Sequence, residues 1–241
     1  MFSILKKELH SFFSSPVGYI IITVFLSLNG LFLWVIPGQY NILESGYANV
    51  DGLFYVTPWL FLFLCPAITM RLFAEEKQLD TWELLITKPL STWSIVLEKF
   101  LAGWLLVLIA LIPTIIYYFS VWYIAEPVGN VDAGAFWGSF IGLILLSLVF
   151  VAIGTFSSTL SNNQIISFVM AILISFVMFY GFELFSSLIT NANISQTFEQ
   201  IGINSHYKSM SRGVIDSKDI SYFSLISFIF IYFTQLKIKI N

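Results

Sequence analysis

The sequence predicts an all-α polytopic membrane protein with six transmembrane helices, and both composition and run length support this fold class. Of the 241 residues, 58% are hydrophobic and 10% are charged, whereas about 25% of the residues in a soluble domain are charged. Six mostly apolar runs approach the roughly 20 residues that a helix needs to cross a bilayer. The runs are continuous rather than alternating, which argues against a transmembrane β-barrel.

We place the transmembrane helices, in chain order, at 17–37, 53–73, 100–124, 135–160, 165–186 and 220–236. No internal repeat and no low-complexity linker divides the chain, so we interpret 1–241 as a single transmembrane domain. Lys and Arg residues are concentrated in the amino-terminal tail, in the loop after the second helix and in the carboxy-terminal tail. Cytoplasmic loops carry such an excess, so we expect both termini and the 71–99 loop in the cytoplasm.

Residues 1–16 precede the first transmembrane helix and predict an amphipathic helix. Apolar residues recur there at three- to four-residue intervals, with Lys6, Lys7 and His10 between them. A helix of this kind lies in the membrane interface with its apolar side toward the acyl chains. The alternative is a disordered, positively charged tail.

The 71–99 loop is a charged island between two apolar runs. Helical spacing puts four apolar side chains on one face, namely Leu72, Leu79, Trp82 and Ile86. An acidic stripe lies beside them, formed by Glu76, Asp80 and Glu83. Pro89 ends the helix, because the residue before a proline disfavours the α region.

This loop carries more apolar surface than one membrane-facing stripe uses. Exposed apolar surface of that kind marks a site of protein contact. We therefore predict a coupling helix over 72–88 that docks a soluble protein. The alternative is a solvated surface helix whose acids serve solubility.

Small and polar residues within the apolar runs mark candidate contacts. Glycines at four-residue spacing let a second backbone approach closely, and the fourth run begins with Gly134, Gly138 and Gly142. Packing within the chain and a dimer seam both remain open for them. Asn29 and Glu183 are polar groups at membrane depth and thus site candidates, although Glu183 also fits the outer interface. The long external loop after the fifth helix predicts short helices.

Several kinds of chemistry lack their residues. No G-x-x-x-x-G-K-[ST] segment is present, so we expect no ATP site of the P-loop type on this chain. The single cysteine, Cys65, and the two histidines exclude a multi-His or Cys-based metal centre. A net charge of −3 argues against nucleic acid as a partner. An intramembrane hydrolase built on Glu75 or Glu76 would need a His partner, and the apolar runs contain none.

Residues 75–91, EEKQLDTWELLITKPLS, resemble the signature of ABC-2-type transporter permeases, which continues to a Lys at the head of the next helix, here Lys99. Asp80 stands where that family usually has Gly. This difference affects only the expected local break in the helix and leaves the family resemblance intact. The stretches 154–164 and 206–223 resemble the family as well. Within it, the sequence is most similar to the permease subunits associated with gliding motility.

The resemblance implies a permease subunit of an ABC exporter in the bacterial inner membrane, paired with a second permease protomer that is the same or a related chain. A separate ABC ATPase would hold ATP and Mg²⁺, and this chain would bind no cofactor. The resemblance places the ATPase contact at Glu75, Glu76, Asp80, Thr81, Trp82, Glu83, Thr87 and Pro89. The alternative function is a non-transporting membrane scaffold or assembly factor of a motility machine.

Overall fold

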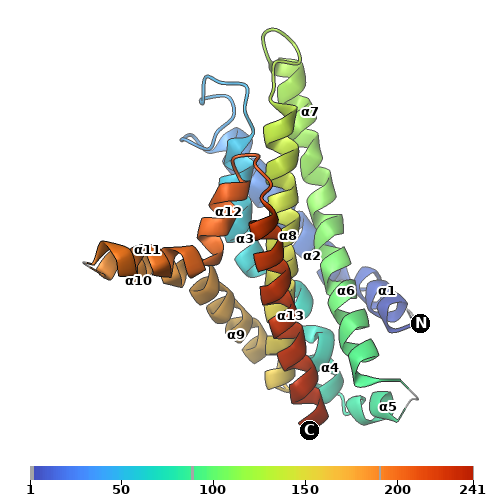
Figure 1. The fold of residues 1–241 in the computed structure, drawn as a ribbon. Helices are drawn as coiled ribbons and strands as arrows, with labels where there is room; N and C mark the ends of the chain where they lie inside the picture. Colours follow the sequence, from blue (N-terminus) through green and yellow to red (C-terminus); the bar gives the residue numbers. More distant parts are fainter. Residues whose placement is uncertain (1–2, 88–89, 190, 241) are drawn as a thin grey trace.

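The computed structural model describes residues 3–87, 90–189 and 191–240, and every regular element within these ranges is a helix (Figure 1). Six helical segments are long and apolar enough to cross a membrane: Pro16–Val35, Asp51–Gln78, Thr92–Ile124, Ala133–Leu160, Gln164–Leu188 and Ser217–Lys239. The predicted fold class, an all-α polytopic membrane protein, is therefore confirmed.

The first half of the chain contains α1 (Ser3–Ser14), α2 (Pro16–Gly30), α3 (Asp51–Thr69), α4 (Arg71–Gln78), α5 (Trp82–Ile86), α6 (Thr92–Leu111) and α7 (Ile115–Ile124). The bend between α1 and α2 is set by Ser15, whose Oγ accepts a hydrogen bond from the Val17 amide, and by Pro16 in the first helical position. The third crossing begins at Thr92 rather than at 100, because Ser91 caps it by accepting from the Ser94 amide.

The second half contains α8 (Ala133–Leu160), α9 (Gln164–Phe176), α10 (Phe182–Leu188), α11 (Ala192–Ile201), α12 (Ile203–Met210) and α13 (Ser217–Ile240). A π-helical turn, Val177–Gly181, joins α9 to α10. The short helices expected between the fifth and sixth crossings are present as α11 and α12. In Figure 1, α10 and α11 lie side by side and run across the direction of the bundle.

Helix α8 is the centre of the bundle. It packs against α3, α6, α9 and α13 (Figure 1), and no Asp, Glu, Lys or Arg occurs in its sequence. Small residues allow the close packing: a Cβ added to Gly154 would lie 2.0 Å from Thr69 Oγ1 of α3. Close backbone approach of this kind drives helix association where no hydrophobic effect operates.

Gly138 and Gly142, near the start of α8, pack within the chain. A Cβ on Gly138 would lie 2.4 Å from the carbonyl oxygen of Gly213, which itself has a φ of +82°. The neighbouring Ser139 Oγ donates to the Ser211 carbonyl at 2.9 Å. A Cβ on Gly142 would meet the Cβ of Met210 at 3.1 Å. The face of α8 that carries Gly138 and Gly142 therefore packs against α12 and the loop after it.

We expect Gly138→Ala to destabilise the protein by about 1–3 kcal/mol, because the added methyl group would overlap backbone that has no room to move. Gly134→Ala is the matched control, since its Cβ would lie 3.3 Å from the end of a single side chain, that of Asp132. Thermal unfolding of both variants in detergent measures the difference. Equal unfolding temperatures would contradict the packing role of Gly138.

Candidate functional site

The segment predicted as one helix over 72–88 is two helices with a break between them, so that prediction was wrong. Helix α4 ends at Gln78 and α5 begins at Trp82. Between them Asp80 has a φ of +54°, a left-handed conformation that ends an α-helix. This is the position where the resembling permeases usually carry Gly, which adopts positive φ without steric cost.

Helix α4 is fastened to the end of α8. Ser158 Oγ accepts from the amides of Phe73 and Ala74, at 2.9 and 3.1 Å, and donates to the Met70 carbonyl. The first amides of a helix have no partner within it, so this hydroxyl satisfies two of them. Lys77 Nζ adds a bond of 2.7 Å to the Thr159 carbonyl. The start and end of α4 are thus both held by α8.

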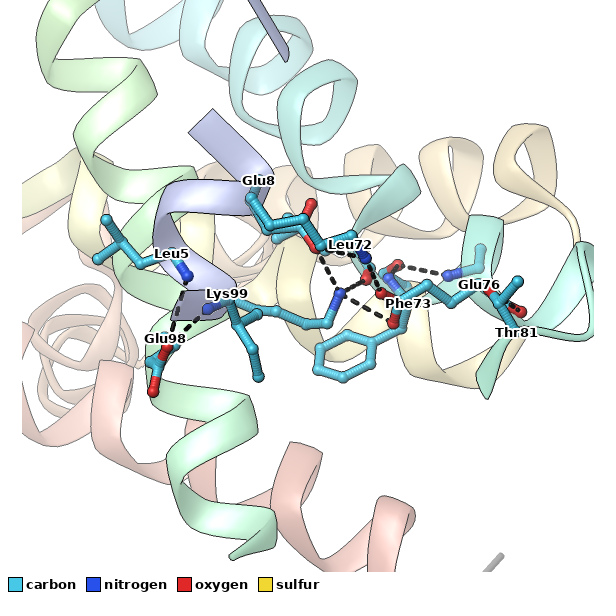
Figure 2. Close-up of polar contacts among 12 residues, drawn as sticks. Leu5, Glu8, Leu72, Phe73, Glu76, Thr81, Glu98 and Lys99 are labelled. Atoms are coloured by element: carbon cyan, nitrogen blue, oxygen red, sulfur yellow. Dashed lines mark hydrogen bonds and ion pairs between the residues drawn. The ribbon is translucent and has the colours of Figure 1, made fainter. Parts of the chain in front are cut away.

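A buried ion cluster lies on the other side of α4. The side chain of Lys99, near the start of α6, has an exposed fraction of 0%. Its Nζ lies 2.8 Å from Glu8 Oε1 and 2.9 Å from Glu76 Oε2, and it also donates to the Leu72 carbonyl (Figure 2). Glu8 belongs to α1 and Glu76 to α4. One ammonium group therefore joins three helices.

Charge balance explains why this cluster is tolerated. A buried ammonium is costly unless it is paired and hydrogen-bonded, and Lys99 reaches two carboxylates and one carbonyl. Lys7 supplies a second cation, with Nζ 2.7 Å from Glu76 Oε1. Burial by itself lowers the pKa of Lys7. The hydrogen bond with Glu76 and the negative charges of Glu76, Glu8 and Glu75 together outweigh this, so the pKa is raised.

Glu98, next to Lys99, fixes the start of α1. Its Oε2 accepts from the amides of Ile4 and Leu5, at 3.0 and 3.4 Å (Figure 2). Its Oε1 accepts from Ser94 Oγ at 3.0 Å. A carboxylate at a helix N-terminus satisfies free amides and interacts favourably with the helix dipole. Consecutive residues of α6 thus hold both the start and the middle of α1.

The predicted acidic stripe does not exist as a surface. Glu76 is buried in the ion cluster, whereas Asp80 and Glu83 are exposed. Periodicity placed the three on one helix face, but the helix ends between the first and the others. This part of the prediction was also wrong.

The remaining predicted coupling residues occupy different environments. Thr81 donates from its amide and its hydroxyl to the Glu76 carbonyl, at 2.9 and 3.2 Å, which closes the turn between α4 and α5. Trp82 is partly buried, with its ring centroid 5.7 Å from that of Phe73. Glu75 is partly exposed and Thr87 is exposed. Pro89 lies outside the described residues.

The two polar candidates at membrane depth join helices. Asn29 of α2 is fully buried; its Oδ1 accepts from Thr57 Oγ1 of α3 at 3.0 Å. Glu183 of α10 pairs with Lys208 Nζ at 2.9 Å and accepts from Asn204 Nδ2 at 2.5 Å, both on α12. Each candidate thus has partners on a neighbouring helix.

Sequence reasoning missed Glu8, Glu98 and, as a site residue, Lys99. One signal could have found the pair on α6. Glu98 and Lys99 lie within the apolar length of a membrane helix, where charged residues are rare and pair with one another or with backbone. Glu8 gave no comparable signal, because charged residues are ordinary in a short amphipathic helix.

Replacing Lys99 with Met should destabilise the protein by about 3–5 kcal/mol, because two carboxylates would lose their buried cation. The control is Lys208→Met, which breaks the Glu183 pair; its lysine side chain is 48% exposed, and exposed pairs contribute about 0–1 kcal/mol. Chemical unfolding in detergent compares the two. Adding Glu8→Gln to Lys99→Met should recover part of the loss, and equal losses for the two lysine variants would disprove the buried role.

Asp80 offers a second test, because its left-handed backbone conformation is unfavourable for most side chains. We expect Asp80→Gly to leave stability unchanged or raise it by up to about 1 kcal/mol, since Gly carries no Cβ penalty there. Asp80→Val should destabilise by about 1–2 kcal/mol, because β-branched residues avoid positive φ. Unfolding temperatures of the two variants measure the difference. The left-handed turn at Asp80 would be contradicted if Asp80→Val were as stable as Asp80→Gly or more stable.

Comparison with known proteins agrees with this architecture. A family model described as ABC-2 family transporter protein matches residues 13–234. This range includes the ion cluster residues of α4 and α6, and it covers most of each of the six apolar crossings. The search of curated proteins gave no significant match. In the matched family the membrane domain is the permease component and not the ATPase. The chain therefore belongs to the ABC-2 transporter family, as a transmembrane permease component of an ABC transporter.

Proposed function

We propose that this permease is driven by a separate ABC ATPase that docks on the coupling segment, which we define as residues 75–89. The Lys/Arg distribution supports a cytoplasmic position for this segment and for both termini. ATP and Mg²⁺ would then bind to the ATPase. The resemblance to gliding-motility permeases supports export across the bacterial inner membrane as the function.

One observation carries this proposal: the coupling segment is exposed where it turns and fixed where it meets the bundle. Leu79 is 64% exposed, and its neighbours Asp80 and Glu83 are exposed as well. Glu76 and Leu85 are buried. Residues 75–87, the described part of the segment, lie at one end of the bundle (Figure 1). An exposed leucine followed by two exposed acidic residues suits a partner surface that combines an apolar pocket with basic residues.

The contacts of α4 supply a route for motion. Ser158 ties α4 to α8, and Lys99 ties it to α1 and α6. A displacement of α4 by a docked ATPase would either move these helices with it or break a buried ion cluster. Because breaking buried pairs is costly, the helices would move together.

Pairing with a second permease protomer, the same or a related chain, completes the proposal. The first and fifth candidate crossings are only 22% and 28% buried within the chain, whereas the fourth is 72% buried. By the family resemblance, the first, second and fifth crossings would bound the transport path between protomers, with α11 and α12 beside its outer end. The low burial of α2 and α9 supports this arrangement.

Charge reversal tests the docking site. Glu83→Lys should weaken binding of the co-expressed ABC ATPase about a hundredfold, because like charges would face each other across the contact. Affinity purification and stimulated ATP hydrolysis in nanodiscs measure this. Glu199→Lys, an exposed reversal on α11, is the control and should change neither. Docking at the coupling segment is wrong if Glu83→Lys retains both association and stimulation.

A further inference from the structure

His206 of α12 has a hydrogen-bond acceptor at each ring nitrogen. Nδ1 lies 2.7 Å from Asp219 Oδ1, and Nε2 lies 2.9 Å from the Gln200 carbonyl oxygen. A neutral imidazole carries one N–H and donates only one hydrogen bond, whereas the doubly protonated ring donates two. Proton positions follow here from the hydrogen-bond network. With Asp219 as a carboxylate, both contacts are hydrogen bonds only when the ring is doubly protonated.

The surroundings of the ring favour a positive charge. The side chain of Asp219 is only 8% exposed, and its Oδ2 has no hydrogen-bond partner among the described residues. The ring of Tyr222 stacks on His206 with centroids 3.8 Å apart, and an aromatic face attracts a cation. Tyr222 also donates from its hydroxyl to the Ile201 carbonyl. The His206 ring thus contacts both α11, through the Gln200 carbonyl, and α13, through Asp219 and Tyr222.

Other charged groups do not replace this pairing. On α12 itself, Lys208 is engaged by Glu183 of α10. Helix α8, which packs against α12, contains no titratable residue, and the Val177–Gly181 turn contains only Tyr180. From α11 the ring meets a backbone carbonyl, and Glu199 beside it is exposed. Asp219 is therefore the carboxylate that compensates a charge on His206.

We propose that His206 and Asp219 form a proton-binding site that fastens α11 and α12 to the start of α13. Binding of a proton to the ring completes two hydrogen bonds and an ion pair across three helices. Loss of that proton leaves one nitrogen facing an acceptor without a hydrogen. The attachment is therefore strong when both ring nitrogens carry a proton and weak when only one does. It lies away from α4 and α5 in the bundle (Figure 1) and does not depend on where an ATPase docks.

The chain allows a direct measurement, because it contains two histidines. In the His10→Gln variant, ¹⁵N-histidine labelling reports on His206 alone. Nuclear magnetic resonance in nanodiscs then follows protonation of both ring nitrogens as pH is raised. Hydrogen–deuterium exchange, corrected for intrinsic rates, follows protection of amides 199–210 in the same sample. We expect protection to fall about tenfold along the protonation curve, the loss expected for one charge-assisted hydrogen bond.

The His206→Gln variant completes the test. It should show low protection of 199–210 at every pH, whereas His10→Gln should follow the wild-type protein. The proposal is overturned if protection in His10→Gln does not change as the ring loses its proton, or if the folded protein never shows a doubly protonated ring. Both outcomes come from the protein with His206 intact, so they stand even if His206→Gln fails to fold.

Discussion

The buried ammonium group of Lys99 is the constraint on which the joining of α1, α4 and α6 depends. Burial makes its charge costly, so carboxylates must reach it from elsewhere in the fold. They come from Glu8 of α1 and Glu76 of α4, and Lys7 of α1 reaches the same Glu76. Satisfying one charge therefore fixes α1, α4 and α6 together. Helix α1 is thereby joined to both α4 and α6.

The break at Asp80 separates α4 from α5, and the two helices have different environments. Helix α4 is held by α8 on one side and by the ion cluster on the other. Helix α5 follows the residue with the left-handed backbone, Asp80, and its acidic residue Glu83 is exposed. A partner that moves α5 would act on α4 through the turn closed by Thr81.

Elsewhere in the bundle, polar groups act as ties between apolar helices. Asn29 links α2 to α3, Glu183 links α10 to α12, and His206 links α12 to α13. In a largely apolar molecule, helices gain little specificity from hydrophobic contact with one another, so hydrogen bonds and close glycine packing set their positions. The close contact of Gly138 with Gly213 positions α8 against the loop after α12 in the same way, by packing rather than by a hydrogen bond.

The sequence by itself determined the six crossings, because long apolar runs with few charges must be covered by lipid. It also predicted the charged loop between the second and third crossings, because charged residues are rare within membrane helices. It did not reveal the break at Asp80, since hydrophobic periodicity is blind to a single positive φ. Only the tertiary structure decided that Glu76 is buried and that Lys99 meets Glu8, 91 positions away. Periodicity shows which face is apolar, but which distant side chain neutralises a buried charge depends on how the helices pack.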